Sequence, residues 1–178
     1  MNAPMEHPKQ MASLRDFSAQ LAQRLSQAPA TRAAQAAQLG VRIGNRGYLV
    51  DMTSVGEVVP LTSIARVPWT RPWFRGMANV RGRLVGVYDL PQMAGDEPMR
   101  DEQGLQLLVL GDALKVNAAL LITRAFGLRS AKNLDALPDT EAGAPWEGAR
   151  FRDVDGMTLT ELHLTQLVAD ERFASIGI

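Results

Sequence analysis

The chain has 178 residues with 19 basic and 19 acidic side chains, so its formal net charge is zero, and it contains no cysteine. This length fits one domain with a tail, and the missing cysteines exclude disulfides and thiolate metal sites. Zero net charge argues against a nucleic-acid binder, because such proteins gain most of their affinity by neutralising phosphates. The only histidines, His7 and His163, lie far apart in the sequence. We therefore expect no metal and no cofactor.

The sequence contains no segment typical of a targeting signal or a membrane span. Residues 1–10 lack the basic-then-apolar order of a signal peptide. The longest apolar run, Ala118–Ile122, is far shorter than the roughly 20 residues needed to cross a bilayer. We expect a soluble, cytoplasmic protein.

Residues 1–38 are predicted to form an extension ahead of the folded domain. Residues 1–12 are rich in proline, methionine and polar side chains and are expected to be disordered. Apolar residues at helical spacing follow Ser13, and Pro29 ends the helix that this spacing predicts. A second, alanine-rich helix is expected over residues 31–39. These helices are expected to dock either on the chain's own core or on a partner.

From Gly40 onward the pattern changes to short β-strands separated by turn residues. Closely spaced strands of this kind predict a mainly β fold, either a barrel or a sandwich. Because long helices do not alternate with the strands, a parallel sheet is disfavoured. The expected strands are residues 41–43, 48–52, 55–59, 64–67, 84–88, 105–110, 116–122, 124–129, 151–154 and 157–159.

Few helices are expected within this domain. Residues 90–94 predict one helical turn, and residues 160–169 predict a closing helix. An acidic surface loop is expected over residues 95–103, and a second loop, rich in proline and glycine, over residues 133–148.

The stretch from Phe74 to Leu90 organises the domain. Its centre, Asn79-Val80-Arg81-Gly82, predicts a chain reversal between two buried strands. A guanidinium at such a turn must be paired or solvated, because a lone buried charge costs several kcal/mol. Glu57, in the strand that begins at Val55, is the nearest upstream carboxylate that could pair with Arg81. The alternative is that Glu57 points to water from a one-sided strand.

Basic and aromatic side chains are interleaved between Glu57 and Asp89, and no acidic residue lies between these two. Such a stretch is typical of three things: nucleic-acid binding through phosphate contacts and stacking, a protein-binding patch, or a solvated rim whose acidic partners come from elsewhere. The residues concerned are Arg66, Arg71, Arg75, Arg81 and Arg83, with Trp69, Trp73 and Phe74.

Catalytic signatures are absent from the sequence. It contains no glycine-rich phosphate loop, no nucleophile elbow and no paired-histidine metal motif. The isolated carboxylates Asp51, Asp89 and Asp155 lie at strand ends or turns, where capping is the expected role. We predict no catalytic residues and a protein that is not an enzyme.

The run from Phe74 to Leu90 resembles the signature of CheW-like coupling proteins, which is Gly-apolar-x-Asn-Leu-Arg-Gly followed by a strand ending in apolar-Asp-Leu. Residues 43–51 are similar to the opening hairpin of that family, and residues 55–59 to its third strand. Residues 72–84 are most similar to the PilI-like branch, which belongs to type IV pilus chemosensory systems.

The resemblance implies two intertwined five-stranded SH3-like barrels that share one core, over residues 39–173, followed by a tail at residues 174–178. It also implies a non-enzymatic adaptor that bridges the cytoplasmic tip of a chemoreceptor to the regulatory domain of a CheA-like histidine kinase, in chemotaxis or twitching motility. Such a protein is recruited to membrane-associated receptor arrays. The alternatives are a scaffold of the same fold that serves another output pathway, or a small-barrel nucleic-acid binder.

The resemblance further implies a receptor groove beside an ion pair between Glu57 and Arg81. Three differences from the family stand out: Val80 replaces leucine, Gly86 replaces proline, and Thr123 and Arg124 stand where many members carry acids. The last difference bears on the partner surface of the second barrel. The residues implied to line or border the groove are Val55, Glu57, Val58, Asn79, Val80, Arg81 and Gly82.

Overall fold

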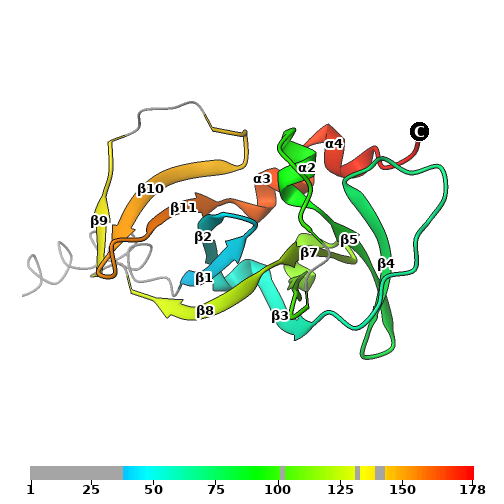
Figure 1. Cartoon of the computed structure of the whole chain (residues 1–178), viewed down its shortest axis with the longest axis horizontal. Helices are drawn as coiled ribbons and strands as arrows, with labels where there is room; N and C mark the ends of the chain where they lie inside the picture. The colour runs from blue at the N-terminus through cyan, green and yellow to red at the C-terminus, as the bar shows by residue number, and fades with distance from the viewer. Residues whose placement is uncertain (1–37, 101–102, 131–132, 139–142) are drawn as a thin grey trace, which may run out of the picture. The chain divides into compact units, whose positions relative to one another are not determined.

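The computed structural model describes residues 38–100, 103–130, 133–138 and 143–178. The helices predicted before residue 38 lie outside the described residues, as do parts of the two predicted loops. The described chain is mainly β, as predicted, with a few short helices (Figure 1). None of the helices among the described residues is long and apolar enough to cross a membrane.

Eleven strands and five short helical segments make up the described chain. The strands are β1 (Gln38–Ile43), β2 (Arg46–Asp51), β3 (Val55–Pro60), β4 (Phe74–Val80), β5 (Arg83–Tyr88), β6 (Gln106–Leu110), β7 (Ala118–Ile122), β8 (Arg124–Arg129), β9 (Leu134–Ala136), β10 (Glu147–Asp153) and β11 (Thr158–Leu162). The helical segments are α2 (Leu90–Ala94), α3 (Leu164–Ala169), α4 (Glu171–Ala174) and the 3-10 turns η1 (Met52–Ser54) and η2 (Asp112–Leu114).

The strands form two sheets, which correspond to the two expected barrels. The first sheet has six strands in the order β8-β1-β2-β11-β10-β9, and the second has five in the order β3-β6-β7-β5-β4. Both ends of the domain thus build the first sheet, while its middle builds the second (Figure 1). Only Thr123 separates β7 from β8, so the chain passes directly from one sheet to the other. The sixth strand of the first sheet, β9, lies inside a segment predicted to be a loop.

One hydrophobic core serves both sheets. Val41 and Val50 of the first sheet and Leu108 and Leu120 of the second are fully buried in the same cluster. All five residues of β7 are buried, because β5 and β6 pair with its two edges and apolar side chains cover both faces. The shared core explains how a chain of alternating short strands folds as one unit.

The hairpin between β4 and β5 turns where the sequence predicts. Arg81 and Gly82 both have positive φ, at 49° and 86°, and Val80 pairs with Arg83 across this two-residue loop. Positive φ at both central residues is the requirement of a type I′ turn. The Asn79 side chain supports the turn by accepting a hydrogen bond from the Gly82 N–H at 2.8 Å. The turn places Arg81 at the tip of the hairpin, where its side chain is largely exposed.

Two predicted elements differ in the structure. Residues 160–162 belong to β11 rather than to the closing helix, which begins only at Leu164. β11 pairs with β10 and, in parallel, with the distant β2, and this tertiary pairing outweighs the helical pattern. The strand predicted over residues 64–67 is reduced to a single bridge between Ala65 and Met77.

Candidate functional site

A groove of about 320 Å³ lies beside the β4–β5 turn, and we call it the charged groove. Its rim carries two acidic and two basic side chains, and its floor is made of valine and leucine. The lining residues are Gly56, Glu57, Val80, Arg81, Arg83, Val85, Val109, Leu110 and Asp112.

The first ion pair of the rim joins Glu57 and Arg81. The Nε atom of Arg81 lies 3.0 Å from Oε2 of Glu57, and the two side chains are 79% and 35% exposed. A pair this exposed contributes only about 0–1 kcal/mol to stability. Glu57 lies on β3 and Arg81 in the turn after β4, so the pair spans between the two edge strands of the second sheet. The main effect of the pair is therefore to position two charges at the rim, and its contribution to the stability of the fold is small.

A second ion pair, which sequence reasoning missed, lies on the same rim. Arg83 Nη1 lies 3.1 Å from Oδ1 of Asp112, a residue of η2. Arg81 and Arg83 come from one hairpin, whereas Glu57 and Asp112 come from β3 and the turn after β6. Since β3 and β6 pair in the sheet, their acidic residues come to the same side of the groove only in the folded chain.

The residues implied by the resemblance are divided between the groove and its surroundings. Glu57, Val80 and Arg81 line the charged groove. Four others are not among its lining residues. Val55 and Val58 are half-buried and pack against the core. Asn79 and Gly82 belong to the β4–β5 turn, where they are joined by a hydrogen bond.

The residues that sequence reasoning missed are Gly56, Arg83, Val85, Val109, Leu110 and Asp112. Arg83 alone carries a local signal, since it follows the turn two residues after Arg81. Val109, Leu110 and Asp112 join the groove through the pairing of β6 with β3, which the sequence does not display.

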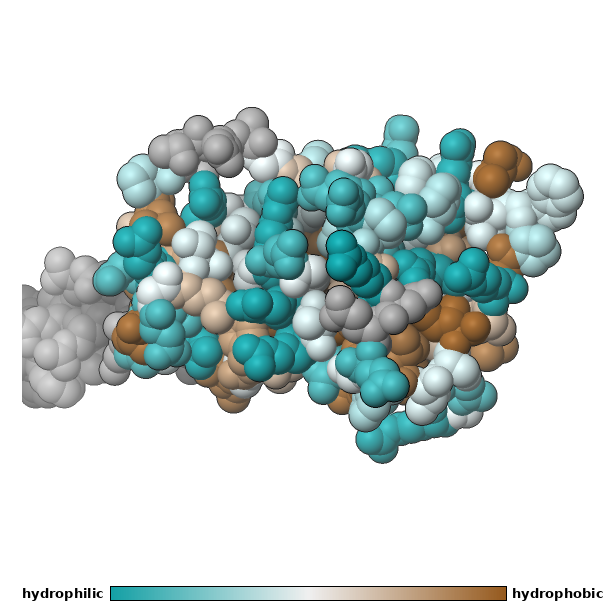
Figure 2. Space-filling view, in the orientation of Figure 1, coloured by the Kyte–Doolittle hydropathy of each residue, from teal (hydrophilic) through white to brown (hydrophobic). Residues whose placement is uncertain are grey.

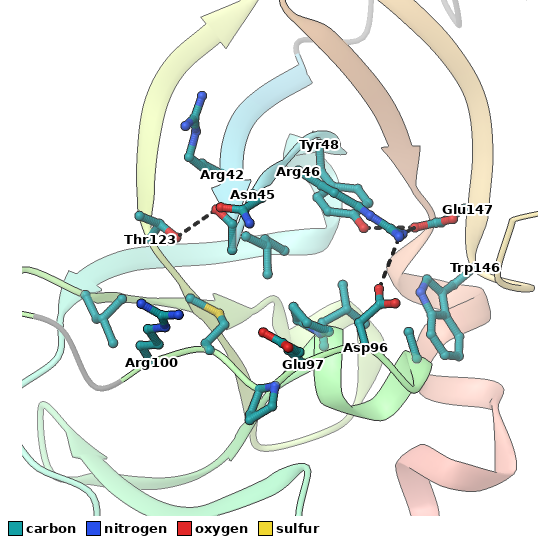
Figure 3. A pocket seen from close by; sticks show the side chains of 18 residues that line it. Arg42, Asn45, Arg46, Tyr48, Asp96, Glu97, Arg100, Thr123, Trp146 and Glu147 are labelled. Carbon is teal, nitrogen blue, oxygen red and sulfur yellow. Dashed lines mark hydrogen bonds and ion pairs between the residues drawn. The ribbon is translucent and has the colours of Figure 1, made fainter.

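A larger cavity of about 690 Å³ is lined by residues of the first sheet, α2 and the loop after it (Figure 3). Three of its six charged side chains pair with one another. Arg46 lies 3.2 Å from Asp96 and 3.6 Å from Glu147, and Tyr48 donates a hydrogen bond of 2.8 Å to Glu147 (Figure 3). Burial raises the pKa of Tyr48 well above its usual value, and the nearby Glu147 carboxylate raises it further, so the phenol stays a donor. This network ties β2 and β10 of the first sheet to the loop after α2.

Nothing in the described parts of the chain gathers three or more residues able to hold a metal ion. The charged groove likewise contains no nucleophile paired with a base, since its side chains are carboxylates, guanidiniums and aliphatic groups. Its chemistry is that of recognition: two fixed ion pairs around an apolar floor.

Comparisons with known proteins give a consistent result. The family model described as CheW-like domain matches residues 38–172. The chain is 36% identical to Protein PilI of Pseudomonas aeruginosa over 93 residues, which are 51% of this chain and 51% of that protein. It is 27% identical to Chemotaxis protein CheW of Thermotoga maritima over 90 residues, which are 51% of this chain and 58% of that protein. The chain thus spans about half the length of the curated relatives it matches.

A solved structure shares the fold. The crystal structure of scaffolding protein TtCheW from Thermoanaerobacter tengcongensis matches with a TM-score of 0.63 at 18% sequence identity. The match covers 78% of this chain and 95% of that chain. The two-sheet architecture described above is therefore a known one.

Proposed function

The chain belongs to the CheW-like domain family, and we propose that it is a non-enzymatic adaptor that couples the cytoplasmic tip of a chemoreceptor to a CheA-like histidine kinase. The observation that carries this proposal is the Glu57–Arg81 ion pair on the rim of the charged groove. The resemblance implies an ion pair at these two positions beside the receptor groove.

The physical character of the groove supports such a role. Protein interfaces combine an apolar centre with a polar rim, and the charged groove has both. A helical receptor tip would lay one face in the groove and meet the alternating charges of the rim. A single contact in a groove of this size is weak, so the overall avidity of the protein for its receptors would come from many such contacts in an ordered receptor array.

The branch of the family that we favour is the pilus-associated one. The likeness to Protein PilI supports it, as does the similarity of residues 72–84 to that branch. The output would then be twitching motility, and the protein would act in the cytoplasm at receptor arrays. We take residues 39–173 as the adaptor domain, residues 1–38 as an extension and residues 174–178 as a tail.

Charge reversal at the rim tests the groove. We expect Arg81→Glu to weaken binding of a purified chemoreceptor tip fragment by about tenfold or more, because the new carboxylate faces Glu57 and repels the acidic side of the partner's charge pattern. The unfolding free energy should change by no more than about 1 kcal/mol, since the ion pair is exposed. Calorimetric titration and urea unfolding measure the two quantities.

Arg152→Glu is the matched control, since Arg152 is exposed on β10 of the other sheet. It should leave receptor binding unchanged. Undiminished binding in Arg81→Glu would remove the groove from the proposal. A pull-down that adds the kinase regulatory domain then tests whether this protein binds the receptor fragment and the kinase domain at the same time. An adaptor should bring down both, whereas a protein with a single partner should bring down only one.

A further inference from the structure

A second hollow, of about 570 Å³, lies at the other end of β4, and we call it the basic hollow. Four arginines line it, and among the described residues that line it none is acidic. It includes most of the basic stretch that the proposed receptor groove leaves unused. The lining residues are Arg66, Val67, Thr70, Arg71, Pro72, Phe74, Arg75, Gln92, Pro98, Met99 and Arg100.

The four arginines differ in how they are held. Arg75 is anchored, because its Nη1 atom donates to Asp89 and to the Met99 carbonyl, each at 3.0 Å. Arg66, Arg71 and Arg100 are exposed, and none of them forms an ion pair within the described ranges of the chain. A concavity lined by charge of one sign concentrates the field and attracts counter-ions. The hollow is therefore built to receive negative charge.

An aromatic side chain stands next to the hollow. Trp69, between the lining residues Val67 and Thr70, is 84% exposed and has a positive φ of 60°. For a residue other than glycine this conformation costs about 1–2 kcal/mol. The C-terminal residues hold the loop in place, since Ile178 N–H donates to the Trp69 carbonyl and Arg71 N–H to the Ile176 carbonyl. An exposed indole beside unpaired arginines has the composition of a protein-binding hot spot.

On the face drawn in Figure 2, the surface around this end does not show one broad apolar area. Hydrophobic side chains reach the visible surface in small separate patches, some of them at the end where β4 and the C-terminus lie (Figure 2). A partner that docks here must therefore be recognised mainly by charge, with Trp69 and Val67 adding apolar contact.

We propose that the basic hollow docks an acidic segment of a partner protein, whose carboxylates pair with Arg66, Arg71 and Arg100 and whose apolar side chain packs on Trp69. A protein segment fits better than a nucleic acid. Three arginines that form no ion pair among the described residues fall short of the roughly six to ten phosphate contacts of a strong nucleic-acid binder, and zero net charge gives no long-range attraction.

The hollow is separate from the charged groove. Arg75 lies near the start of β4 and Arg81 just beyond its end, and six residues of strand span about 20 Å. Both surfaces can therefore be occupied at once, one at each end of β4. Docking in the basic hollow does not require a receptor in the charged groove. A variant at one of these two sites therefore tests that site without disturbing the other site.

The test uses the full chain and a fluorescein-labelled, glutamate-rich peptide that contains one leucine, with the glutamine version of the same peptide as the neutral probe. Fluorescence anisotropy should show binding of the acidic probe only. In Arg66→Glu/Arg71→Glu the affinity should fall by about tenfold or more, because two attractions become repulsions. Trp69→Ala should weaken binding by a smaller factor, and Arg152→Glu should leave it unchanged.

Circular dichroism and urea unfolding confirm that each variant is folded. Equal binding of the acidic and neutral probes, no binding of either, or full binding by the double variant would each overturn the proposal. Tighter binding of a single-stranded thymidine oligonucleotide than of the acidic peptide would also overturn it, in favour of a nucleic-acid site. In Arg81→Glu the peptide should bind as in the wild type, whatever that variant does to receptor binding.

Discussion

Replacing Asp89 by alanine is expected to lower the free energy of unfolding by about 3–5 kcal/mol. Asp89 is fully buried, and its Oδ2 atom accepts hydrogen bonds from Arg75 Nη1 at 3.0 Å and from Met99 N–H at 2.9 Å. Its Oδ1 atom accepts from Gln92 N–H at 3.1 Å and caps α2. Removing the carboxylate takes a buried charge away from the largely buried Arg75 and leaves backbone donors without their acceptor.

Urea unfolding measures this loss, and Asp51→Ala is the matched control. Asp51 also caps a helical turn, with Oδ1 accepting from Thr53 N–H at 2.8 Å, but its environment is exposed. Its removal should cost only about 0.5–2 kcal/mol. Asp89→Asn keeps the size of the side chain and should fall between the two. If Asp89→Ala cost no more than Asp51→Ala, Asp89 would be a helix cap alone.

These two aspartates show which contacts the sequence predicts and which it does not. A cap depends on neighbours within three or four residues, so the position of Asp89 before Leu90 was sufficient to predict that role. Its ion pair with Arg75 joins β4 to the end of β5, and its bond to Met99 reaches into a loop. The contact with Arg75 follows from the predicted β4–β5 hairpin, whereas the bond to Met99 depends on how the loop after α2 folds back, which local patterns do not specify.

The same division applies to the fold and the site. The hairpin of β1 and β2, the Arg81–Gly82 turn and the helical turn over residues 90–94 follow from local patterns, and their bounds were predicted within three residues. Residues 160–162 of β11 were predicted as helix, because the partner strand β2 lies over a hundred residues earlier in the chain. The pairing of Arg83 with Asp112, which lies 29 residues later in the chain, could likewise not be predicted from local patterns.

Gly76→Ala is expected to destabilise the chain by about 2–5 kcal/mol, through both steric overlap and backbone strain. Gly76 has a φ of 129°, and a Cβ built there would lie 2.3 Å from the carbonyl oxygen of Ala65. Ala65 and Met77 exchange two backbone hydrogen bonds, of 2.8 and 2.9 Å, beside this point. A methyl group must therefore separate the loop before β4 from the strand itself.

Gly82→Ala is the control that separates the two causes. Gly82 also has a positive φ, of 86°, but no atom lies within 4 Å of a Cβ built there. Its substitution should cost only the conformational strain, about 1–2 kcal/mol. The loop that Gly76 lets approach carries Arg66 and Arg71, so Gly76→Ala should also weaken binding of the acidic peptide, whereas Gly82→Ala should not. Equal losses of stability in the two variants would mean that the loop moves away from the new methyl group at little cost. The bridge between Ala65 and Met77 would then not determine the shape of the basic hollow.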